Sequence, residues 1–324
     1  MVKGLYTAHT GMVNEMKRLD VLANNLANAD TTGYKKEGTT SRTFADEMSF
    51  RLKDSSNAYM PKKLGGITYG VHLGQVYTDY STGSFKVTDN TTDFAIDGNG
   101  FFAIAFTDKQ GNTSVKYTRD GSFVLDNEGN LLTSKGYRVL GYAITKTDPN
   151  AGANKNNDDN IRPNGDVLYV ESNSKTVASD EKLVSLKIPD KVIKDNGDKV
   201  AVKSFNISAD GLITGVLETG EITALGQIAM SSFKNEVGLT DIGNNMYEPS
   251  GSSGAAIISS GKNSTAGRNS SGYGDILQGY LEMSGVDMAE QFTDMIVATK
   301  AFQAAGKTIT TGDEILSEII NLKR

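Results

Sequence analysis

Near the start of the chain, apolar residues recur at every seventh position. The repeating positions, with Leu22 on the same face, are Leu5, Met12, Leu19 and Leu26. A spacing of seven residues brings side chains onto one side of an α-helix and is typical of helices that pair with other helices. We therefore predict an N-terminal helix with a coiled-coil-like apolar seam, which ends near Asn28 before a turn-forming sequence.

A second, longer seam lies in the last part of the chain. Its members stand seven residues apart and are Leu281, Met288, Met295, Phe302, Ile309 and Leu316. The spacing predicts a helix within residues 281–324. Gly306 and Gly312 lie within this predicted helix, and each glycine weakens a helix by about 1 kcal/mol relative to alanine. Either seam alone also fits an ordinary amphipathic helix packed on its own domain. Because the two seams flank a β-rich region, we expect them to pair.

Between the seams, short apolar runs separated by turn residues predict strands. The clearest is a meander at residues 113–144, whose turns contain Gly121, Gly129 and Gly136. The expected fold class is mixed and mainly β: a discontinuous β-rich body, paired terminal α-helices and an inserted β-rich domain. The predicted parts are a helical domain (1–28 with 281–324), an extended linker with a short helical piece at Phe44–Leu52 (29–70), a β-rich core (71–144 with 201–280) and an inserted domain or loop region (145–200).

Composition excludes several kinds of chemistry. The 324 residues include no Cys, no Trp and two His, and the net charge is −6. Disulfides, thiolate metal sites and cysteine nucleophiles are therefore excluded, and His9 and His72 lack partners at ligand spacing. The mild acidity gives no reason to expect nucleic acid. No run of 18 apolar residues predicts a membrane span, and the N-terminus lacks the apolar run of a secretory signal.

Two lookalikes of functional motifs favour turns instead. Gly98-Asn99-Gly100-Phe101-Phe102-Ala103 matches a variant of the dinucleotide-binding fingerprint. That fingerprint requires a helix after the glycines, whereas the aromatic and aliphatic residues here predict a strand. The carboxylates Asp93, Asp97, Asp120 and Asp126 could in principle form a glycosidase-like pair, but Asp97 and Asp120 each precede a glycine, where aspartate forms turns. We expect no catalytic residue, cofactor or metal, and hence no enzyme.

Four blocks of sequence resemble the bacterial flagellar hook and basal-body rod protein family. The first contains Asn24, Asn25 and Asn28, followed by Gly33 and Tyr34, and the second contains Asp97, Gly98, Gly100, Phe101 and Phe102, followed by Tyr117–Phe123. The third is Gly226–Ala229 with Gly243–Tyr247, and the fourth runs from Tyr280 through Asp287 to Ala301–Ala304 and Asn321–Arg324. Residues 145–200 match nothing in the family pattern. The resemblance is closest to the distal rod protein or its proximal-rod relative.

The resemblance implies a structural axial subunit that polymerises helically into the rod transmitting torque between motor and hook. It implies that the terminal helices line an inner tube, with the seam residues as assembly contacts, and that the β-domain forms the outer wall. Implied partners are copies of itself, other rod and hook proteins and the flagellar export apparatus, with no nucleic acid or membrane insertion. The implied location is the basal body outside the cytoplasmic membrane, reached without a cleavable signal. A hook subunit is the alternative, and a cell-surface β-domain carbohydrate binder or glycosidase is a more distant one.

Overall fold

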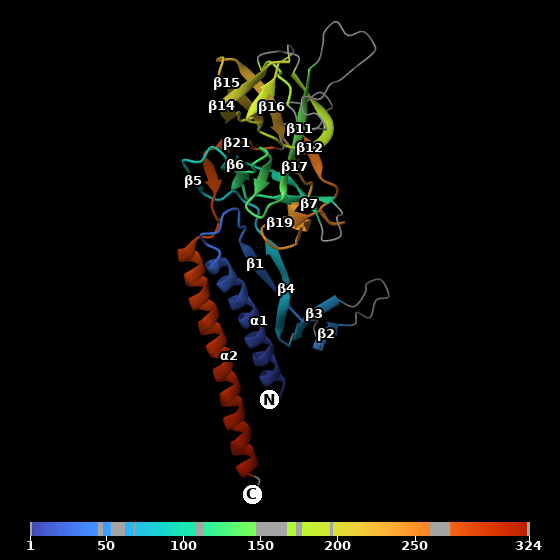
Figure 1. Cartoon of the computed structure of the whole chain (residues 1–324). Helices are drawn as coiled ribbons and strands as arrows, with labels where there is room; N and C mark the ends of the chain where they lie inside the picture. Colours follow the sequence, from blue (N-terminus) through green and yellow to red (C-terminus); the bar gives the residue numbers. More distant parts are fainter. Residues whose placement is uncertain are drawn as a thin grey trace, which may run out of the picture. The chain divides into compact units, whose positions relative to one another are not determined.

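The computed structural model divides the chain into two compact units, each described separately below (Figure 1). The first, here called the helical unit, comprises Met1–Ala29, Lys35–Asp79 and Val286–Arg324, and the second, the β unit, comprises Asp30–Tyr34 and Tyr80–Gly285. The structure describes residues 2–44, 48–52, 62–67, 69–107, 113–146, 167–172, 177–194, 197–259 and 273–322.

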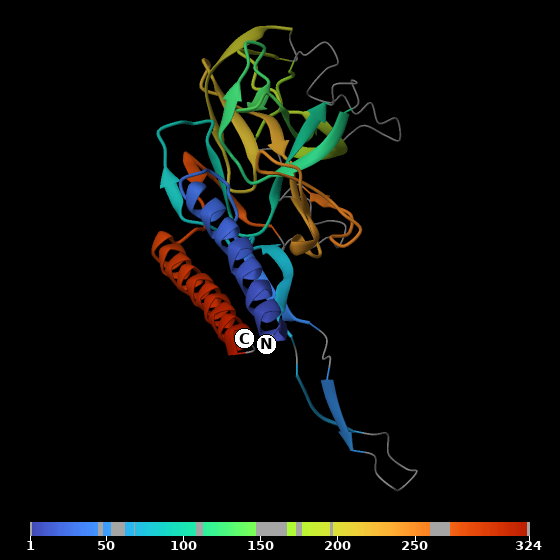
Figure 2. The same ribbon diagram turned by 90° about the horizontal axis from the view of Figure 1, so that it is seen from below.

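Two long helices dominate the helical unit and lie side by side (Figures 1 and 2). They are α1 (Val2–Ala27) and α2 (Met288–Leu322). The helices run antiparallel, because Leu5 of α1 lies beside Gly312 of α2 whereas Asn25 bonds to Gln291 near the start of α2. The end of α1 agrees with the predicted end near Asn28.

The start of α2 differs from the prediction. The Oδ1 atom of Asp287 accepts hydrogen bonds from the backbone N–H groups of Ala289 (2.8 Å) and Glu290 (3.3 Å), which satisfies donors that a helix start leaves free. Leu281 lies before this cap, in strand β22 (Tyr280–Glu282), and pairs with Lys86 of β5 (Phe85–Val87). The heptad spacing extended the helix one repeat too far because spacing alone does not reveal a cap.

Residues 29–70 contain strands where the sequence predicted an extended linker. Strand β1 (Glu37–Thr43) pairs antiparallel with β4 (Val71–Thr78), and β2 (Met48–Leu52) pairs with β3 (Lys62–Ile67). The predicted helical piece at Phe44–Leu52 is wrong, because β2 occupies its described second half. Both two-stranded ribbons, β1–β4 and β2–β3, form by backbone pairing between separate segments of the chain. The threonine-rich sequence of β1 also suits a strand.

The β unit is built on a 14-stranded sheet with the strand order β13-β14-β15-β16-β11-β7-β8-β19-β18, and with β9, β10, β12, β17 and β20 attached beside this path. Two smaller ladders pair β21 with β6 and β22 with β5. The remaining bounds are β6 Phe94–Asp97, β7 Phe101–Thr107, β8 Thr113–Thr118, β9 Phe123–Leu125, β10 Leu131–Thr133, β11 Arg138–Lys146, β12 Val177–Ser185, β13 Lys191–Ile193, β14 Lys199–Ile207, β15 Leu212–Leu217, β16 Ile222–Ile228, β17 Met230–Ser232, the 3-10 helix η1 Glu236–Gly238, β18 Thr240–Asp241, β19 Met246–Glu248, β20 Ile257–Ser259 and β21 Asp275–Gln278.

The described part of residues 145–200 does not stand apart as an inserted domain. Strand β12 pairs along β11, and β13 pairs with β14, so both belong to the main sheet. Residues 147–166 of the predicted inserted domain or loop region lie outside the described residues. The predicted start of the β-rich core at residue 71 also differs, since β4 belongs to the helical unit and the β unit resumes at Tyr80.

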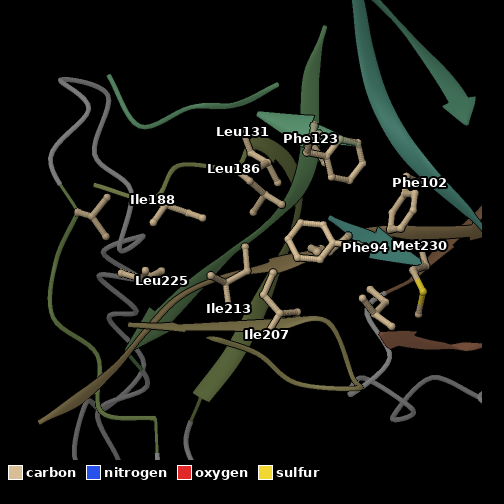
Figure 3. Close-up of a cluster of buried hydrophobic side chains, with 14 of the residues drawn as sticks. Phe94, Phe102, Phe123, Leu131, Leu186, Ile188, Ile207, Ile213, Leu225 and Met230 are labelled. Carbon is tan, nitrogen blue, oxygen red and sulfur yellow. The ribbon is translucent and has the colours of Figure 1, made fainter. Parts of the chain in front are cut away.

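Strand β7 separates two apolar clusters of the β unit. Its alternation sends Phe102 into a cluster with Phe94 and Phe123 (Figure 3), and sends the neighbouring Phe101 into a second cluster with Tyr117 and Tyr247. Successive residues of a strand point to opposite faces, so two consecutive phenylalanines serve two cores. Both side chains are fully buried.

Candidate assembly surface

The contact between α1 and α2 explains the two glycines inside the α2 seam. A Cβ atom added at Gly312 would lie 2.6 Å from Cδ2 of Leu5, and one added at Gly306 would lie 3.4 Å from Cε of Met12. Both glycines therefore face α1 and leave room for the larger side chains of its seam. Glycine lowers the helix propensity at these two positions, but it allows the two helices to approach closely.

The predicted seam residues are mostly half-buried rather than buried. Leu22 is the one seam residue on α1 that is buried. The half-buried set comprises Leu5, Met12, Leu19, Leu26, Met295, Phe302, Ile309 and Leu316, whereas Met288 is exposed and Leu281 lies outside the helix. Leu5 and Met12 are the two whose contacts with α2 are defined above. The seams thus lie partly at the helix contact and retain accessible surface.

Polar side chains occupy several of the buried positions of the pair, which the sequence reasoning missed. The Nδ2 group of Asn25 donates to Oε1 of Gln291 (3.1 Å) and to the backbone oxygen of Glu37 (2.8 Å). The Oδ1 atom of Asn25 accepts from the N–H of Glu37 at 2.9 Å. Asn25 and Gln291 are 1% and 5% exposed. Asn25 was noted only as a signature residue. The signal in the sequence was the position of Asn25: it directly precedes the seam residue Leu26 and lies on the same face of the helix as Leu22.

Two further polar contacts hold α1 within the helical unit. The Nδ2 group of the buried Asn14 donates to Oγ of Ser41 in β1 at 3.0 Å. Arg18 lies 3.5 Å from the carboxylate of Asp294 in α2, although both side chains are partly exposed, so this ion pair contributes little. Together these contacts join α1 to α2 on one side and to β1 on another.

The described parts of both helices also expose large apolar side chains. On α2, Met288, Phe292 and Ile296 follow one another at intervals of four residues, and Ile296 is 62% exposed. A second group on α2 comprises Ile315, Ile319, Ile320 and Leu322, while α1 exposes Tyr6 and Met16. At 100° per residue, Met288, Phe292 and Ile296 lie on a different side of α2 from Ile315, Ile319 and Leu322. Contiguous exposed apolar groups of this kind mark interaction surfaces.

A pocket of about 270 Å³ in the helical unit carries mixed charge. Its lining includes Arg18, Lys36, Asp79, Glu290 and Asp294. The Nζ atom of Lys36 lies 3.6 Å from Asp79 and 3.9 Å from Glu290, so the cation is shared between two carboxylates.

In the β unit, signature residues converge on a buried ion pair. Arg119 and Glu282 have side chains 0% and 1% exposed, and Nη1 of Arg119 lies 3.3 Å from Oε2 of Glu282. Arg119 also donates to the backbone oxygen of Gly98 at 2.8 Å. The backbone oxygen of Glu282 accepts from the N–H of Gly33 at 2.8 Å, and its Oε1 accepts from the N–H of Gly83 at 2.9 Å. One ion pair therefore ties together five separate segments.

Gly33 fits this junction because it has no side chain. Its φ is +66°, and an added Cβ would lie 2.8 Å from the backbone nitrogen of Asp120. Alongside it, Thr32 donates to Oδ1 of Asp120 (3.2 Å), and Asn245 donates to the backbone oxygen of Thr32 (2.8 Å). Of the other signature residues, Asn28 donates to the backbone oxygen of Asn24 at the end of α1, and Tyr34 is half-buried.

The dinucleotide lookalike is a turn between strands, as predicted. Gly98 and Gly100 have φ of +118° and +134°, and they connect β6 directly to β7. Asp97 is exposed at the end of β6. Asp120 accepts from the N–H (3.1 Å) and hydroxyl (2.8 Å) of Ser122, which is the predicted turn-forming role. Within the described ranges, no group of three or more potential ligands gathers as a metal site requires. No described helix is long and apolar enough to cross a membrane.

The described structure therefore defines a class: a mainly β protein whose paired terminal helices carry exposed apolar faces. Comparison with known proteins identifies the class. Residues 5–35 match the family described as flagella basal body rod protein, residues 95–215 match the D1 domain of flagellar hook protein FlgE/F/G, and residues 277–322 match the C-terminal region of flagellar basal body rod FlgEFG proteins.

Two curated rod proteins match along their whole length. The flagellar basal-body rod protein FlgG of Bacillus subtilis is 35% identical over 329 residues, covering 100% of both chains. FlgG of Borreliella burgdorferi is 30% identical over 326 residues, again covering 100% of both. The flagellar hook protein FlgE of the same organism is 25% identical over 456 residues, with 100% coverage of both. A crystal structure of Helicobacter pylori hook protein FlgE2 matches at 15% identity, covering 68% of this chain and 47% of that one, but its TM-score of 0.22 adds nothing to the assignment.

The chain belongs to the flagellar hook and basal-body rod protein family. It is a structural axial subunit of the basal-body rod, and its named relatives are structural proteins of the flagellum rather than enzymes. The hook alternative is weaker. An alignment of 456 positions against a chain of 324 residues leaves over a hundred hook positions without a counterpart, whereas the rod alignments need almost no such gaps.

Proposed function

We propose that the chain polymerises with copies of itself into a helical tube through the helical unit, with α1 and α2 as a coiled-coil-like inner layer and the β unit outside it. The observation that carries this proposal is the pair of apolar groups on different sides of α2. A helical polymer needs two different surfaces on each subunit, since each copy contacts one neighbour with one patch and another neighbour with the other. The half-buried seams would supply further contact area.

The proposed partners are further copies and other rod and hook proteins, with delivery by the flagellar export apparatus to the basal body outside the cytoplasmic membrane. Family membership supports these assignments. The role of residues 145–200 is proposed to be local to the β unit, because their described strands pair with β11 and β14. Deleting the gene tests the rod assignment: cells that still build hooks would contradict a required rod part.

The test of assembly compares two single charges on α2. Ile296→Asp places a carboxylate on the exposed apolar group, whereas Thr293→Asp adds the same charge at an exposed polar position one turn away. Concentrated protein is examined by electron microscopy and sedimentation. We expect tubes or rods from the wild type and Thr293→Asp, and at least a tenfold higher critical concentration for Ile296→Asp, because an unpaired charge must be desolvated in the contact.

The seam residues provide a second arm. Leu19→Asp and Phe302→Asp should also block polymerisation while circular dichroism shows the β unit intact. Normal tubes from Ile296→Asp would show that the exposed apolar group is not needed for assembly. Normal tubes from the seam variants would show the same for the seams.

A further inference from the structure

The seven-residue spacing of the two apolar seams does not by itself fix which turn of α1 meets which turn of α2. Both seams repeat at exactly seven residues, so sliding α1 by one heptad returns its seam to the same side of α2, although Leu5 and Met12 would then leave Gly312 and Gly306. Space for such a slide exists, because α2 has 35 residues and α1 has 26, a difference of nine. A slide of seven residues toward the C-terminal end of α2 would keep all of α1 alongside it.

The buried carboxamides distinguish the two registers. In the observed register, Asn25 meets Gln291 and donates across the pair at 3.1 Å. After the slide, Asn25 would lie opposite Ala298, which is fully buried and has no side-chain acceptor. Gln291 would lose its partner as well. Because each is at most 5% exposed, unpaired carboxamides here would be desolvated without compensation.

Hydrogen bonds to β1 also hold α1 in the observed position. Asn25 forms two hydrogen bonds with the backbone of Glu37, at 2.8 and 2.9 Å. Asn14, which lies eleven residues before Asn25 on α1, donates to Ser41 of β1. A slide of α1 would break these contacts too. Together with the contacts of Leu5 and Met12 at Gly312 and Gly306, the polar residues thus discriminate between registers that share the same heptad spacing, as single buried polar residues do in coiled coils.

We propose that Asn25 and Gln291 are positioning residues that select the register of the α1–α2 pair, and so decide which apolar groups of α2 remain uncovered for assembly. The register selection rests on the single chain and holds whether or not the helices polymerise. Its consequence for assembly rests on the proposed function. The register experiment below therefore fails or succeeds independently of tube formation.

The absence of cysteine makes register directly measurable in the full chain. Cysteines at Met12 and Gly306 report the observed register, since these positions adjoin. Cysteines at Met12 and Asp313 report the slide by one heptad. Each pair is oxidised in three backgrounds: wild type, Asn25→Leu with Gln291→Leu, and the control Asn24→Leu with Gln303→Leu, which makes the same changes at exposed positions of the same helices.

We expect the wild type and control to form the 12–306 disulfide almost exclusively. In the Asn25→Leu/Gln291→Leu chain, the ratio of 12–313 to 12–306 disulfide should rise at least about tenfold, because the part of the penalty that comes from unpaired carboxamides is gone. A merely structural role would lower stability without changing this ratio. An unchanged ratio, or equal yields of both disulfides in the wild type, overturns the proposal.

A conservative variant keeps the test decisive if the double leucine chain does not fold. Gln291→Glu retains an acceptor for Asn25 and adds negative charge in the first turns of α2, where the helix dipole favours it. We expect Gln291→Glu to keep the wild-type disulfide ratio and Gln291→Leu alone to raise it. If both single variants give the same ratio, the carboxamide contact does not select the register.

Discussion

At the scale of single residues, the helical unit departs from the usual arrangement of apolar inside and polar outside. On α2 the two buried residues are Gln291 and Ala298, while Phe292 and Ile296 are exposed. Small and polar side chains therefore occupy the buried positions of α2, whereas large apolar ones such as Phe292 and Ile296 are exposed. Gly306 and Gly312 follow the same logic, since each accommodates a seam side chain of α1.

A double-mutant cycle tests this account of Gly312. Gly312→Ala should gain little, because the added Cβ meets Leu5 at 2.6 Å and the expected propensity gain of about 1 kcal/mol is offset by displacement of that side chain. In a Leu5→Ala background the same change should stabilise α2 by about 1 kcal/mol. Amide exchange of α2 measures both values. Equal effects in the two backgrounds would show that Leu5 does not restrict position 312.

Tyr247 gives a prediction for alkaline pH. Burial raises the pKa of its phenol, with nearby Tyr80 adding to the effect. A raised pKa in the folded state means that only the unfolded chain loses this proton just above about pH 10. Tyr247 therefore contributes stability that is fully present below about pH 10 and is lost as pH rises, at about 1.4 kcal/mol per pH unit.

The measurement is the free energy of unfolding in urea, followed by circular dichroism across the alkaline range. Tyr247→Phe should show a decline shallower by about 1.4 kcal/mol per pH unit above about pH 10. Between about pH 7 and 9 the two curves should run parallel, which serves as an internal control. Equal slopes above pH 10 would contradict the raised pKa.

At the scale of elements, the β unit depends on a junction where several strand ends meet. Arg119 directly follows β8, Gly98 follows β6, and Glu282 ends β22. Arg119 also lies over the ring of Phe101, 5.3 Å from its centroid. A charge enclosed this completely is tolerated only with its partner in place, so the pair makes the positions of these strand ends interdependent.

Arg119→Met should therefore destabilise the β unit by about 3–5 kcal/mol, because it leaves the carboxylate of Glu282 buried without its partner. Adding Glu282→Gln should restore part of the loss by removing that charge. Lys194→Met removes one partner of a partly exposed pair with Glu221 and should destabilise the chain far less than Arg119→Met does. Urea unfolding measures all three variants. A loss from Arg119→Met no larger than that from Lys194→Met would refute the role of the junction.

The sequence predicts those elements whose signal is local. The end of α1, the β6–β7 turn at Gly98 and Gly100, and the turn role of Asp120 follow from spacing and turn chemistry. The start of α2, the strands at residues 37–67 and the membership of β12 in the main sheet were missed, because they depend on a cap or on pairing between distant segments. The same holds for the surface: apolar periodicity located the seams, whereas Asn25 and Gln291 acquire their role only when two helices meet.

At the scale of the whole molecule, the two units differ in how much of their structure is secured within one chain. The β unit has three apolar clusters of fully or nearly fully buried side chains. The helical unit buries Leu22 and Ala298 but leaves most seam residues half-buried. Regions with few buried apolar contacts open locally at lower free energy than core strands do. The helices therefore have the most to gain from contacts with other subunits.

Amide exchange of the free chain and of the assembled polymer tests this difference. In the free chain, amides at residues 12–26 and 295–316 should exchange about a hundredfold or more faster than those in β7, β11 and β16, because fraying of the helix pair requires no opening of the β clusters. Assembly should slow exchange in both helices and leave the three strands nearly unchanged, which makes the strands the control. Strong protection of the helices in the free chain, equal to that of the strands, would mean that the pair is complete without neighbours. The exposed apolar residues of α2 would then need another explanation, because assembly would add contacts without making the helices more ordered.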